Sequence, residues 1–190
     1  MRVKIYTKSG DHGKTSIIGG ERLAKSDPRI HAYGSLDETN AWIGEIISQL
    51  ADEHLKLQKE LLQLQVLLFD IGTDLATPEG IRDYIVNQQH LLEVESLIDT
   101  YAKQVPPIEK FVLPGGHLLA SHFHIARTVT RRAEREITQL VSDGIPINLH
   151  AFKVVNRLSD LFFILARYMN FVYDVKEPFY ERAGKVFHND

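Results

Sequence analysis

The stretch EHLKLQKELLQLQVLLFDIGTDL (residues 53–75) decides the fold class of this chain. Its apolar side chains recur three or four residues apart, at Leu57, Leu61, Leu64, Leu68 and Ile71. That spacing places them on one face of an α-helix, because an α-helix turns once every ~3.6 residues. The stretch therefore predicts a long amphipathic helix whose apolar face packs against other helices.

A second helix is expected after Gly34, with Ser35 as its N-cap. A serine hydroxyl at that position accepts a hydrogen bond from the free amides of the first turn. Glu38 lies three residues after Ser35, as a capping box requires, and Asp37 adds negative charge to the positive end of the helix dipole. The apolar face of this helix would consist of Leu36, Ile43, Ile46, Ile47 and Leu50.

The same periodicity predicts three more helices, at residues 82–104, 117–141 and about 147–173. Pro106 and Pro107 stop the first of these, because proline lacks the amide hydrogen that a helix interior needs, and Gly144 follows the second. Most connections are short. The sequence therefore predicts an all-α fold, an up-and-down bundle of about five helices with an irregular N-terminal segment.

Length and composition are those of an ordinary globular domain. The chain has 190 residues, of which 44% are hydrophobic and 25% are charged, so it can bury a sizeable core. No repeat, low-complexity tract or linker divides it. We therefore expect a single domain over residues 1–190, with an N-terminal loop (1–33), a helical bundle (34–175) and a C-terminal tail (176–190).

Composition also excludes several classes of function. A net charge of -3 argues against general binding of nucleic acid or anionic membranes, and the absence of cysteine excludes disulfides and thiolate chemistry. The longest apolar run, Leu161 to Leu165, is far shorter than the ~20 residues that span a bilayer. We therefore expect a cytoplasmic protein without nucleic-acid or membrane partners. The predicted helices carry no Glu-x-x-His pair for a protein-ligated metal, and we interpret His117, His122 and His124 as solvated or capping residues.

Glycine, lysine and hydroxyl residues dominate the N-terminal stretch TKSGDHGKTS (residues 7–16). Small residues expose backbone N–H groups to an anion, and lysine and hydroxyl side chains add donors. Gly13, Lys14 and Thr15 match the end of a P-loop, but Lys8 stands where that motif requires its first glycine. The stretch is therefore either a phosphate-binding loop of another kind or a polar terminus without a ligand.

A second basic stretch, ARTVTRRAER (residues 126–135), lies on a predicted helix. Arg127 and Arg131 share one face, Arg135 continues that row, and Arg132 points elsewhere. Guanidinium groups in one row repel each other unless an anion lies along them, and arginine suits phosphate and carboxylate. The row therefore binds a phosphate ligand or takes part in an interhelical ion-pair network. The candidate internal carboxylates are Asp37, Glu134 and Asp160.

Polar residues also interrupt the last predicted helix, at NRLSD (residues 156–160). Polar groups near the core side of a helix need partners. Asn156, Arg157 and Asp160 therefore form a structural network with Arg131 or line a ligand site. Together the three polar stretches indicate a site for a polyphosphate.

In order and in detail, the chain resembles the PduO-type ATP:cob(I)alamin adenosyltransferase family. The matching segments are IYTKSGDHG (5–13), GGER (19–22) with Lys25, AYGSLDETN (32–40), FVLPGG (111–116), ARTVTRRAER (126–135) and NRLSD (156–160). They span nearly the whole chain. Departures such as Thr39, where leucine is usual, leave the essential residues in place.

The resemblance implies that ATP binds between neighbouring subunits of a homotrimer. The N-terminal loop of one subunit would hold the nucleotide through Thr7, Lys8, Ser9, Gly10, Gly13, Thr15, Ser16 and Lys25. The neighbour would contribute Arg127, Arg131, Glu134 and Asn156. Asp37 would pair with Arg127 across the interface, and Mg²⁺ would bind mainly through the phosphates of ATP rather than through a protein metal site.

The resemblance also implies the reaction. The cobalt of reduced corrinoid, cob(I)alamin, would attack C5′ of ATP to form adenosylcobalamin and release triphosphate. Arg127, Arg131 and Lys8 would stabilise the leaving triphosphate. Phe111 would close the lower face of the corrinoid, and Phe187 in the C-terminal segment is a second candidate for corrinoid contact. A reductase and an adenosylcobalamin-dependent enzyme are further expected partners.

Two other functions fit the same residues. A non-catalytic corrinoid carrier would bind adenosylcobalamin and deliver it without consuming ATP. A helical interaction protein would use its arginines to pair with acids across an oligomer interface, and it would bind neither ligand. The intact N-terminal loop favours the enzyme over both.

Overall fold

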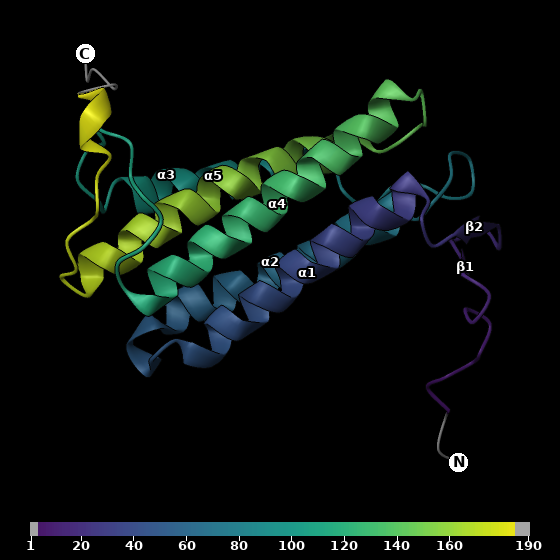
Figure 1. The fold of residues 1–190 in the computed structure, drawn as a ribbon, viewed down its shortest axis with the longest axis horizontal. Coiled ribbons are helices and arrows are strands. Elements are labelled where there is room, and N and C mark those ends of the chain that lie inside the picture. Colours follow the sequence, from purple (N-terminus) through teal and green to yellow (C-terminus); the bar gives the residue numbers. More distant parts are fainter. Residues whose placement is uncertain (1–3, 185–190) are drawn as a thin grey trace.

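A computed structural model describes residues 4–184 as a bundle of long antiparallel helices (Figure 1). The helices are α1 (Pro28–Gln49), α2 (Leu55–Leu75), α3 (Gln88–Ala102), α4 (Leu118–Ser142) and α5 (Leu149–Val172). Short 3-10 helices cover Asp52–His54 and Glu181–Ala183, and two short strands are β1 (Lys14–Ser16) and β2 (Arg22–Ala24). The predicted all-α bundle of about five helices is confirmed. None of the described helices combines the length and hydropathy that crossing a membrane requires.

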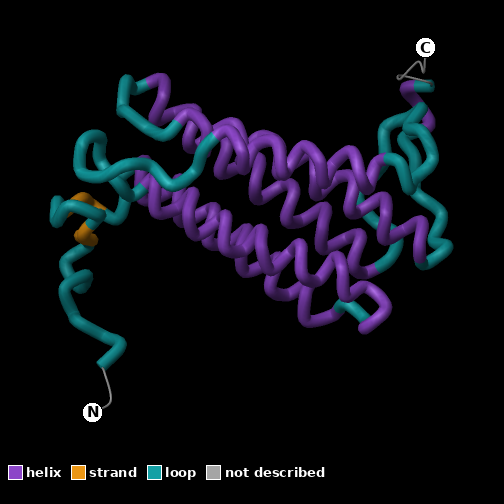
Figure 2. Tube along the Cα trace, turned by 180° about the vertical axis from the view of Figure 1, so that it is seen from behind, coloured by secondary structure: helices purple, strands orange, loops and turns teal. Residues whose placement is uncertain are grey.

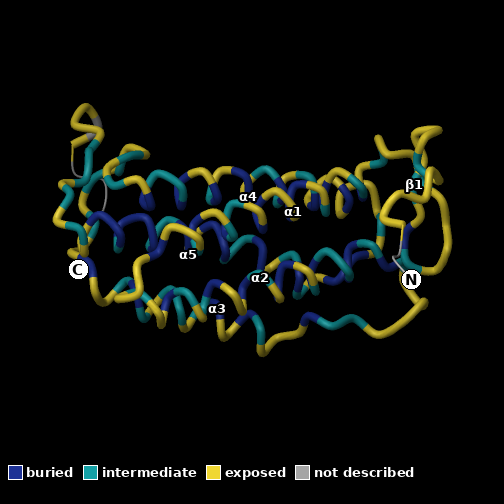
Figure 3. Tube along the Cα trace, turned by 90° about the horizontal axis from the view of Figure 1, so that it is seen from below, coloured by how far each residue is buried: buried dark blue, intermediate teal, exposed yellow. Residues whose placement is uncertain are grey.

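The core lies between the long helices. Helix α4 packs between α1 and α5, while α2 packs on α1 and α3 on α5. Every predicted apolar position of α2, from Leu57 to Ile71, is buried, as the dark blue positions along the helices in Figure 3 illustrate. Phe123 and Phe162 join α4 to α5 with their rings stacked at 6.3 Å. The 3.6-residue periodicity therefore identified the correct packing face.

The predicted start of the first helix was wrong. Helix α1 begins at Pro28, and the Asp27 side chain caps it by accepting a hydrogen bond from the Arg29 amide at 2.8 Å. Proline suits this first position because its fixed φ is already helical and its missing N–H has no intrahelical role there. Ser35 lies inside the helix and is buried, where its hydroxyl accepts a hydrogen bond from Arg132 Nε at 3.3 Å.

The third helix also begins later than predicted, at Gln88. The Asp74 carboxylate at the end of α2 is fully buried and accepts hydrogen bonds from the amides of Ile85 and Val86, each at 2.9 Å to its nearer oxygen. Asn148 donates to the same carboxylate at 2.7 Å. Asp74 therefore holds the preceding residues out of a helix, and Asn87 caps α3 instead.

The N-terminal segment is a hairpin rather than a loop alone. Strands β1 and β2 pair antiparallel, with Thr15 opposite Leu23. Ile17 and Ile18 lie in the connecting turn, where the Gly20 amide donates to the Ile17 carbonyl at 3.1 Å. Figure 2 shows this hairpin at one end of the bundle and the C-terminal segment at the other.

Candidate functional site

Four of the predicted site residues meet along neighbouring faces of α4 and α5. Glu134 on α4 accepts a hydrogen bond from the Asn156 amide on α5 at 2.7 Å. Asn156 in turn accepts from Arg157 Nη1 at 2.9 Å, and Arg157 Nε donates to Glu95 at 2.9 Å. Arg157 therefore has its own carboxylate, whereas Glu134 and Asn156 form a preorganised polar pair on the arginine-bearing face of α4.

Arg127 is the least compensated charge in this group. It is half-buried, and its Nε is buried without a hydrogen-bond partner. Burial first, and then the positive charge of Arg131, lower the pKa of Arg127 below its ordinary value. A guanidinium stays charged in proteins, so the lowered pKa expresses a need for negative charge at this position.

The ion-pair alternative applies to other arginines. Arg132 forms an ion pair with Glu38 on α1, and Arg157 pairs with Glu95. Among the residues that the structure describes, Arg127 and Arg131 make no ion pair. Internal carboxylates therefore leave both arginines that the sequence assigned to a phosphate ligand without an ion pair.

Asp160 is the nearest internal candidate for pairing with the arginine row, but it forms no ion pair in the described part of the chain. Burial raises the pKa of Asp160, and Glu134 adds to that rise, while Arg157 and Arg131 oppose it. The raised pKa means that the surroundings of Asp160 disfavour its charged form. Asp160 is also exposed, and no ion pair of the described chain joins it to Arg127 or Arg131.

The N-terminal loop is built around backbone turns that only a few residues can adopt. Gly13 has a φ of 72°, and its amide donates to the Gly10 carbonyl at 3.1 Å, while Lys8 takes a φ of 60°. Arg22 Nη2 donates to the Ser9 carbonyl at 2.5 Å, which fixes this segment against β2. A Cβ on Gly10 would lie 3.1 Å from Nζ of Lys25, so the absence of a side chain lets that ammonium group lie over the backbone.

Donor side chains of this loop are open to solvent. Thr7, Lys8, Ser9, Ser16 and Lys25 are all exposed, and Thr15 is half-buried. A loop with exposed ammonium and hydroxyl groups over a glycine-rich backbone suits a phosphate chain.

The loop and the arginine face belong to different regions of one chain. The Ile18 amide donates to the Ala76 carbonyl at 3.0 Å, and Arg29 ties the end of α2 to the α4–α5 turn through Leu75 (2.5 Å) and Pro146 (3.2 Å). These contacts place the hairpin at the end of the bundle, and the chain before it extends away from α4 and α5 (Figures 1 and 2). Between residues 4–25 and the arginine face, the described structure has no hydrogen bond or ion pair.

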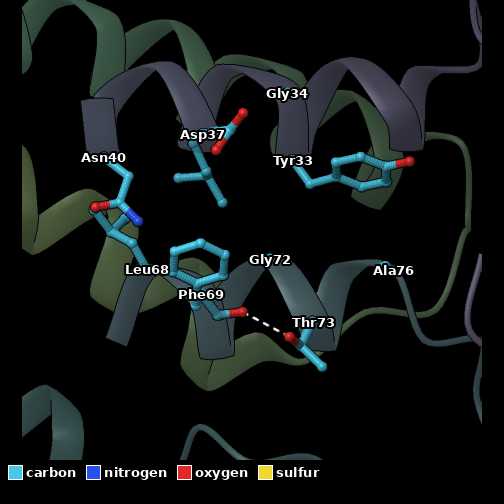
Figure 4. Close-up of a pocket in the computed structure, with 10 residues that line it drawn as sticks. Tyr33, Gly34, Asp37, Asn40, Leu68, Phe69, Gly72, Thr73 and Ala76 are labelled. Carbon is cyan, nitrogen blue, oxygen red and sulfur yellow. Dashed lines mark hydrogen bonds between the residues drawn. The ribbon is translucent and has the colours of Figure 1, made fainter. Parts of the chain in front are cut away.

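Asp37 lies elsewhere again, at a pocket of about 320 Å³ between α1 and α2. Figure 4 shows Tyr33, Asp37 and Asn40 of α1 facing Phe69 and Thr73 of α2. Gly34 and Gly72 line the pocket without side chains to fill it. Asp37 is exposed, and within the described chain it makes no ion pair with Arg127, so its predicted partner could only come from another copy.

Phe111, the first of the two predicted corrinoid residues, lies at the opposite end of the bundle from the hairpin. Phe111 is 48% exposed on the segment before α4. Its carbonyl accepts from the Tyr180 amide at 2.8 Å. Phe187 lies outside the described residues.

Sequence patterns missed two buried polar residues near this end of the bundle. Arg167 and Asn170 are buried on α5, and Arg167 binds Glu177 of the C-terminal segment through two guanidinium nitrogens. A charged residue and an amide in an otherwise apolar helix were the available signal, but their partners are too distant in sequence to infer.

His124 corrects the interpretation of the histidines as solvated or capping residues. His117 does cap α4, by accepting from the Leu119 amide at 3.3 Å. His124 is only 3% exposed, and neither of its ring nitrogens has a hydrogen-bond partner. Burial, and then the charge of Arg127, lower the pKa of His124 to about 4, so the imidazole is neutral near pH 7.

Comparison with known proteins identifies the family. A family model described as cobalamin adenosyltransferase matches residues 5–169. The corrinoid adenosyltransferase of Bacillus subtilis (strain 168) is 41% identical over 187 residues, which cover 97% of this chain and 96% of that protein. The corrinoid adenosyltransferase of Mycobacterium leprae (strain TN) is 42% identical over 181 residues, covering 90% of this chain and 94% of that protein.

A solved structure of a variant PduO-type ATP:corrinoid adenosyltransferase from Lactobacillus reuteri, complexed with cobalamin and ATP, has the same fold. The two structures align with a TM-score of 0.92 at 45% sequence identity, over 97% of this chain and 100% of that one. Similarity of this extent in both sequence and fold, together with the family match, shows that the chain belongs to the cobalamin adenosyltransferase family.

Proposed function

We propose that the protein transfers the 5′-deoxyadenosyl group of ATP to the Co(I) of a reduced corrinoid, at active sites that form between two copies of the chain. The relatives are named corrinoid adenosyltransferases, and the Lactobacillus reuteri protein was solved with both cobalamin and ATP. The observation that carries the proposal is the half-buried Arg127, whose Nε has no partner and whose charge no internal carboxylate neutralises. A triphosphate supplies the missing negative charge.

We infer a site shared between two copies because the N-terminal loop and the arginine face lie in different regions of one chain. Thr7, Lys8 and Lys25 would hold the nucleotide from one copy, while Arg127 and Arg131 would hold it from the other. The remaining contributors from the loop are Ser9, Gly10, Gly13, Thr15 and Ser16, and those from the helices are Glu134 and Asn156. Asp37 of the first copy would pair with Arg127 of the second, which places the α1–α2 pocket at the interface.

The surface of α2 supports association of copies. Leu62, Val66 and Phe69 are 49%, 63% and 68% exposed, and they lie along one side of that helix. A row of exposed apolar side chains next to an exposed carboxylate is typical of a protein–protein interface. We propose that this surface packs against a neighbouring copy, in a closed homotrimer whose three interfaces are equivalent.

The reaction makes a cobalt–carbon bond and breaks a carbon–oxygen bond. The electron pair of Co(I) forms the bond to C5′, and the pair of the C5′–O bond leaves with triphosphate, so that cobalt is formally oxidised from +1 to +3. The protein therefore needs no nucleophile or base. Its tasks are to align cobalt with C5′ and to stabilise charge on the leaving triphosphate.

Arg127, Arg131 and Lys8 would carry out the second task. A donor that strengthens its contact in the transition state contributes about 3 kcal/mol, by analogy with oxyanion-hole donors. Magnesium would bind the phosphate oxygens and water. That hard cation prefers phosphate oxygens and water to a full protein cage.

Phe111 would serve the corrinoid rather than the nucleotide. A half-exposed aromatic ring at the end of the bundle could cover the lower face of the corrinoid and exclude a lower axial ligand. Cobalt without that ligand is easier to reduce, because an axial donor stabilises Co(II) relative to Co(I). The role of Phe187 in corrinoid contact, a reductase partner, a receiving enzyme and a cytoplasmic location stay predictions.

An anaerobic assay with chemically reduced cob(I)alamin and MgATP tests the reaction. The expected result is adenosylcobalamin, followed by absorbance, together with one triphosphate per turnover. Binding of adenosylcobalamin without turnover would instead identify a corrinoid carrier. Absence of both turnover and binding would mean that the arginine face is structural.

A further inference from the structure

Two segments that are distant in sequence pair at the corrinoid end of the bundle. We call residues 106–116 the Phe111 loop and residues 174–184 the C-terminal strap. Val112 of the loop forms an antiparallel bridge with Phe179 of the strap. The Tyr180 amide donates to the Phe111 carbonyl and the Leu113 amide donates to the Pro178 carbonyl, each at 2.8 Å. The backbone at Phe111 and over the two residues that follow it is therefore bonded to the strap.

A buried ion pair anchors the strap to α5. Arg167 is 4% exposed and donates through Nε and Nη2 to the two carboxylate oxygens of Glu177, at 2.9 Å each. Arg167 Nη2 also donates to the Pro106 carbonyl at 3.0 Å. One guanidinium thus joins the helix, the strap and the start of the Phe111 loop, in the bidentate geometry that makes an arginine–carboxylate pair specific.

The other end of the Phe111 loop is held by Asn170, one turn further along α5. Its fully buried amide accepts from the His117 backbone N–H at 2.8 Å and donates to the Gly115 carbonyl at 3.1 Å. Arg167 and Asn170 therefore fix the two ends of the loop to the same helix. The strap supports the middle, where Phe111 is located.

We propose that the Arg167–Glu177 pair is a clamp that positions Phe111 against the lower face of the corrinoid, acting through the strap. The inference rests on the proposed function, because it assigns the clamp to that same site. Phe111 is 48% exposed, so the backbone of its loop carries much of its positioning. Neither Arg167 nor Glu177 needs to touch substrate; both are positioning residues. The start of the strap is also held by the Val175 amide, which donates to the Asn170 carbonyl at 2.8 Å. Without the clamp the strap beyond Val175 separates from α5, and the bonds at Phe111 and Leu113 open with it.

The test uses Glu177→Gln in the full-length protein. Lys110→Ala is the matched control, because it removes the Lys110–Glu181 ion pair (2.5 Å) that joins loop and strap, and in which the Glu181 carboxylate is largely exposed. Hydrogen exchange at the Leu113 and Tyr180 amides is measured without substrate. Formation of four-coordinate Co(II) with MgATP is followed by absorbance and electron paramagnetic resonance, and MgATP affinity is measured in parallel.

Glu177→Gln should raise exchange at both amides by about tenfold or more, because their bonds then open locally rather than with the whole fold. It should abolish the four-coordinate Co(II) signature as Phe111→Ala does, while MgATP affinity stays at the wild-type value. The double variant Phe111→Ala/Glu177→Gln should lose no more of the four-coordinate Co(II) signal than Phe111→Ala alone, since both substitutions act on the position of one side chain. Lys110→Ala should match wild type in every measurement.

Unchanged exchange in Glu177→Gln, or raised exchange with a normal Co(II) signature, would overturn the clamp. A loss of Co(II) signal in Phe111→Ala/Glu177→Gln that equals the sum of the two single losses would overturn the clamp too. If Glu177→Gln does not fold, Arg167→Met with Glu177→Met keeps the packed volume without a buried charge and should give the same results. A wild-type chain that makes no adenosylcobalamin would refute the proposed function, while the exchange rates would still decide whether the clamp fixes the Phe111 backbone.

Discussion

Asn156 on α5 donates a 2.7 Å hydrogen bond to the Glu134 carboxylate on α4, and this pair lies one turn or less from Arg131. The same Asn156 accepts from Arg157, so both ends of its amide are fixed. The polar groups around the arginine row are therefore preorganised, whereas Arg127 itself has no internal anion. An uncompensated cation beside fixed polar groups suits a ligand with several negative charges.

Arg127→Lys should lower kcat by about a hundredfold and leave the folded bundle intact. Lysine keeps the positive charge but loses the planar fork that grips phosphate oxygens, and a loss of about 3 kcal/mol of transition-state stabilisation corresponds to that factor. Turnover with chemically reduced cob(I)alamin and thermal unfolding provide the two measurements. Arg135→Ala, an exposed residue of the same helix, is the control; a normal kcat in Arg127→Lys would contradict the assignment.

Phe111→Ala should separate reduction from transfer. Binding of MgATP and turnover of supplied cob(I)alamin should stay near wild type, because the proposal assigns the Phe111 side chain to the corrinoid and the triphosphate to other residues. The four-coordinate Co(II) signature should disappear, since water or another ligand can then reach the lower face of cobalt. An unchanged Co(II) spectrum would exclude this role for Phe111.

Gly116→Ala should destabilise the protein by about 2–4 kcal/mol, measured by urea unfolding. Gly116 has a φ of 101°, and an added Cβ would overlap Oδ1 of the buried Asn170. Gly144→Ala is the matched control. Its φ is 72°, but a Cβ there meets nothing within 4 Å, so only backbone strain of about 1 kcal/mol is expected. Equal losses in the two variants would show that the Asn170 contact does not matter.

His124 should make stability depend on pH. Its folded-state pKa of about 4 lies below the ordinary 6.5, so the unfolded chain takes up this proton first as pH falls. The stability associated with neutral His124 is therefore complete above about pH 6.5 and is lost progressively towards pH 4. Across this window the urea midpoint of unfolding should fall more steeply with decreasing pH in wild type than in His124→Leu. Parallel slopes would show that His124 does not titrate in this way.

Residue spacing in the sequence was enough to predict the features that depend on neighbouring residues, such as which face of a helix is buried. The spacing of Leu57 to Ile71 identified the buried face of α2, and the spacing of Arg127 and Arg131 placed both on one face of α4. Ser35 was wrong as an N-cap because Asp27 and Pro28 offered a better start about two turns earlier.

Contacts between distant segments could not be predicted in this way. The delayed start of α3 depends on Asp74, which is 11 residues from Ile85, one of the amides it binds. The strap depends on Arg167 meeting Glu177, and on Phe111 meeting Tyr180. Such pairs are determined by the assembled bundle, and no periodicity in the sequence records them. In the proposed shared site, the contact between loop and arginine face requires a second copy, so one chain could not reveal it either.

Mixing two inactive variants tests the shared active site most directly. Lys8→Ala removes a donor from the loop, and Arg127→Ala removes the cation from the helix face. If each site uses the loop of one copy and the helix of another, co-assembled trimers made from equal amounts should regain about a quarter of wild-type sites, because a site is intact only when each variant supplies its unaltered half. Mixed oligomers that form but regain no activity would show that each chain carries a complete site, and would contradict the account.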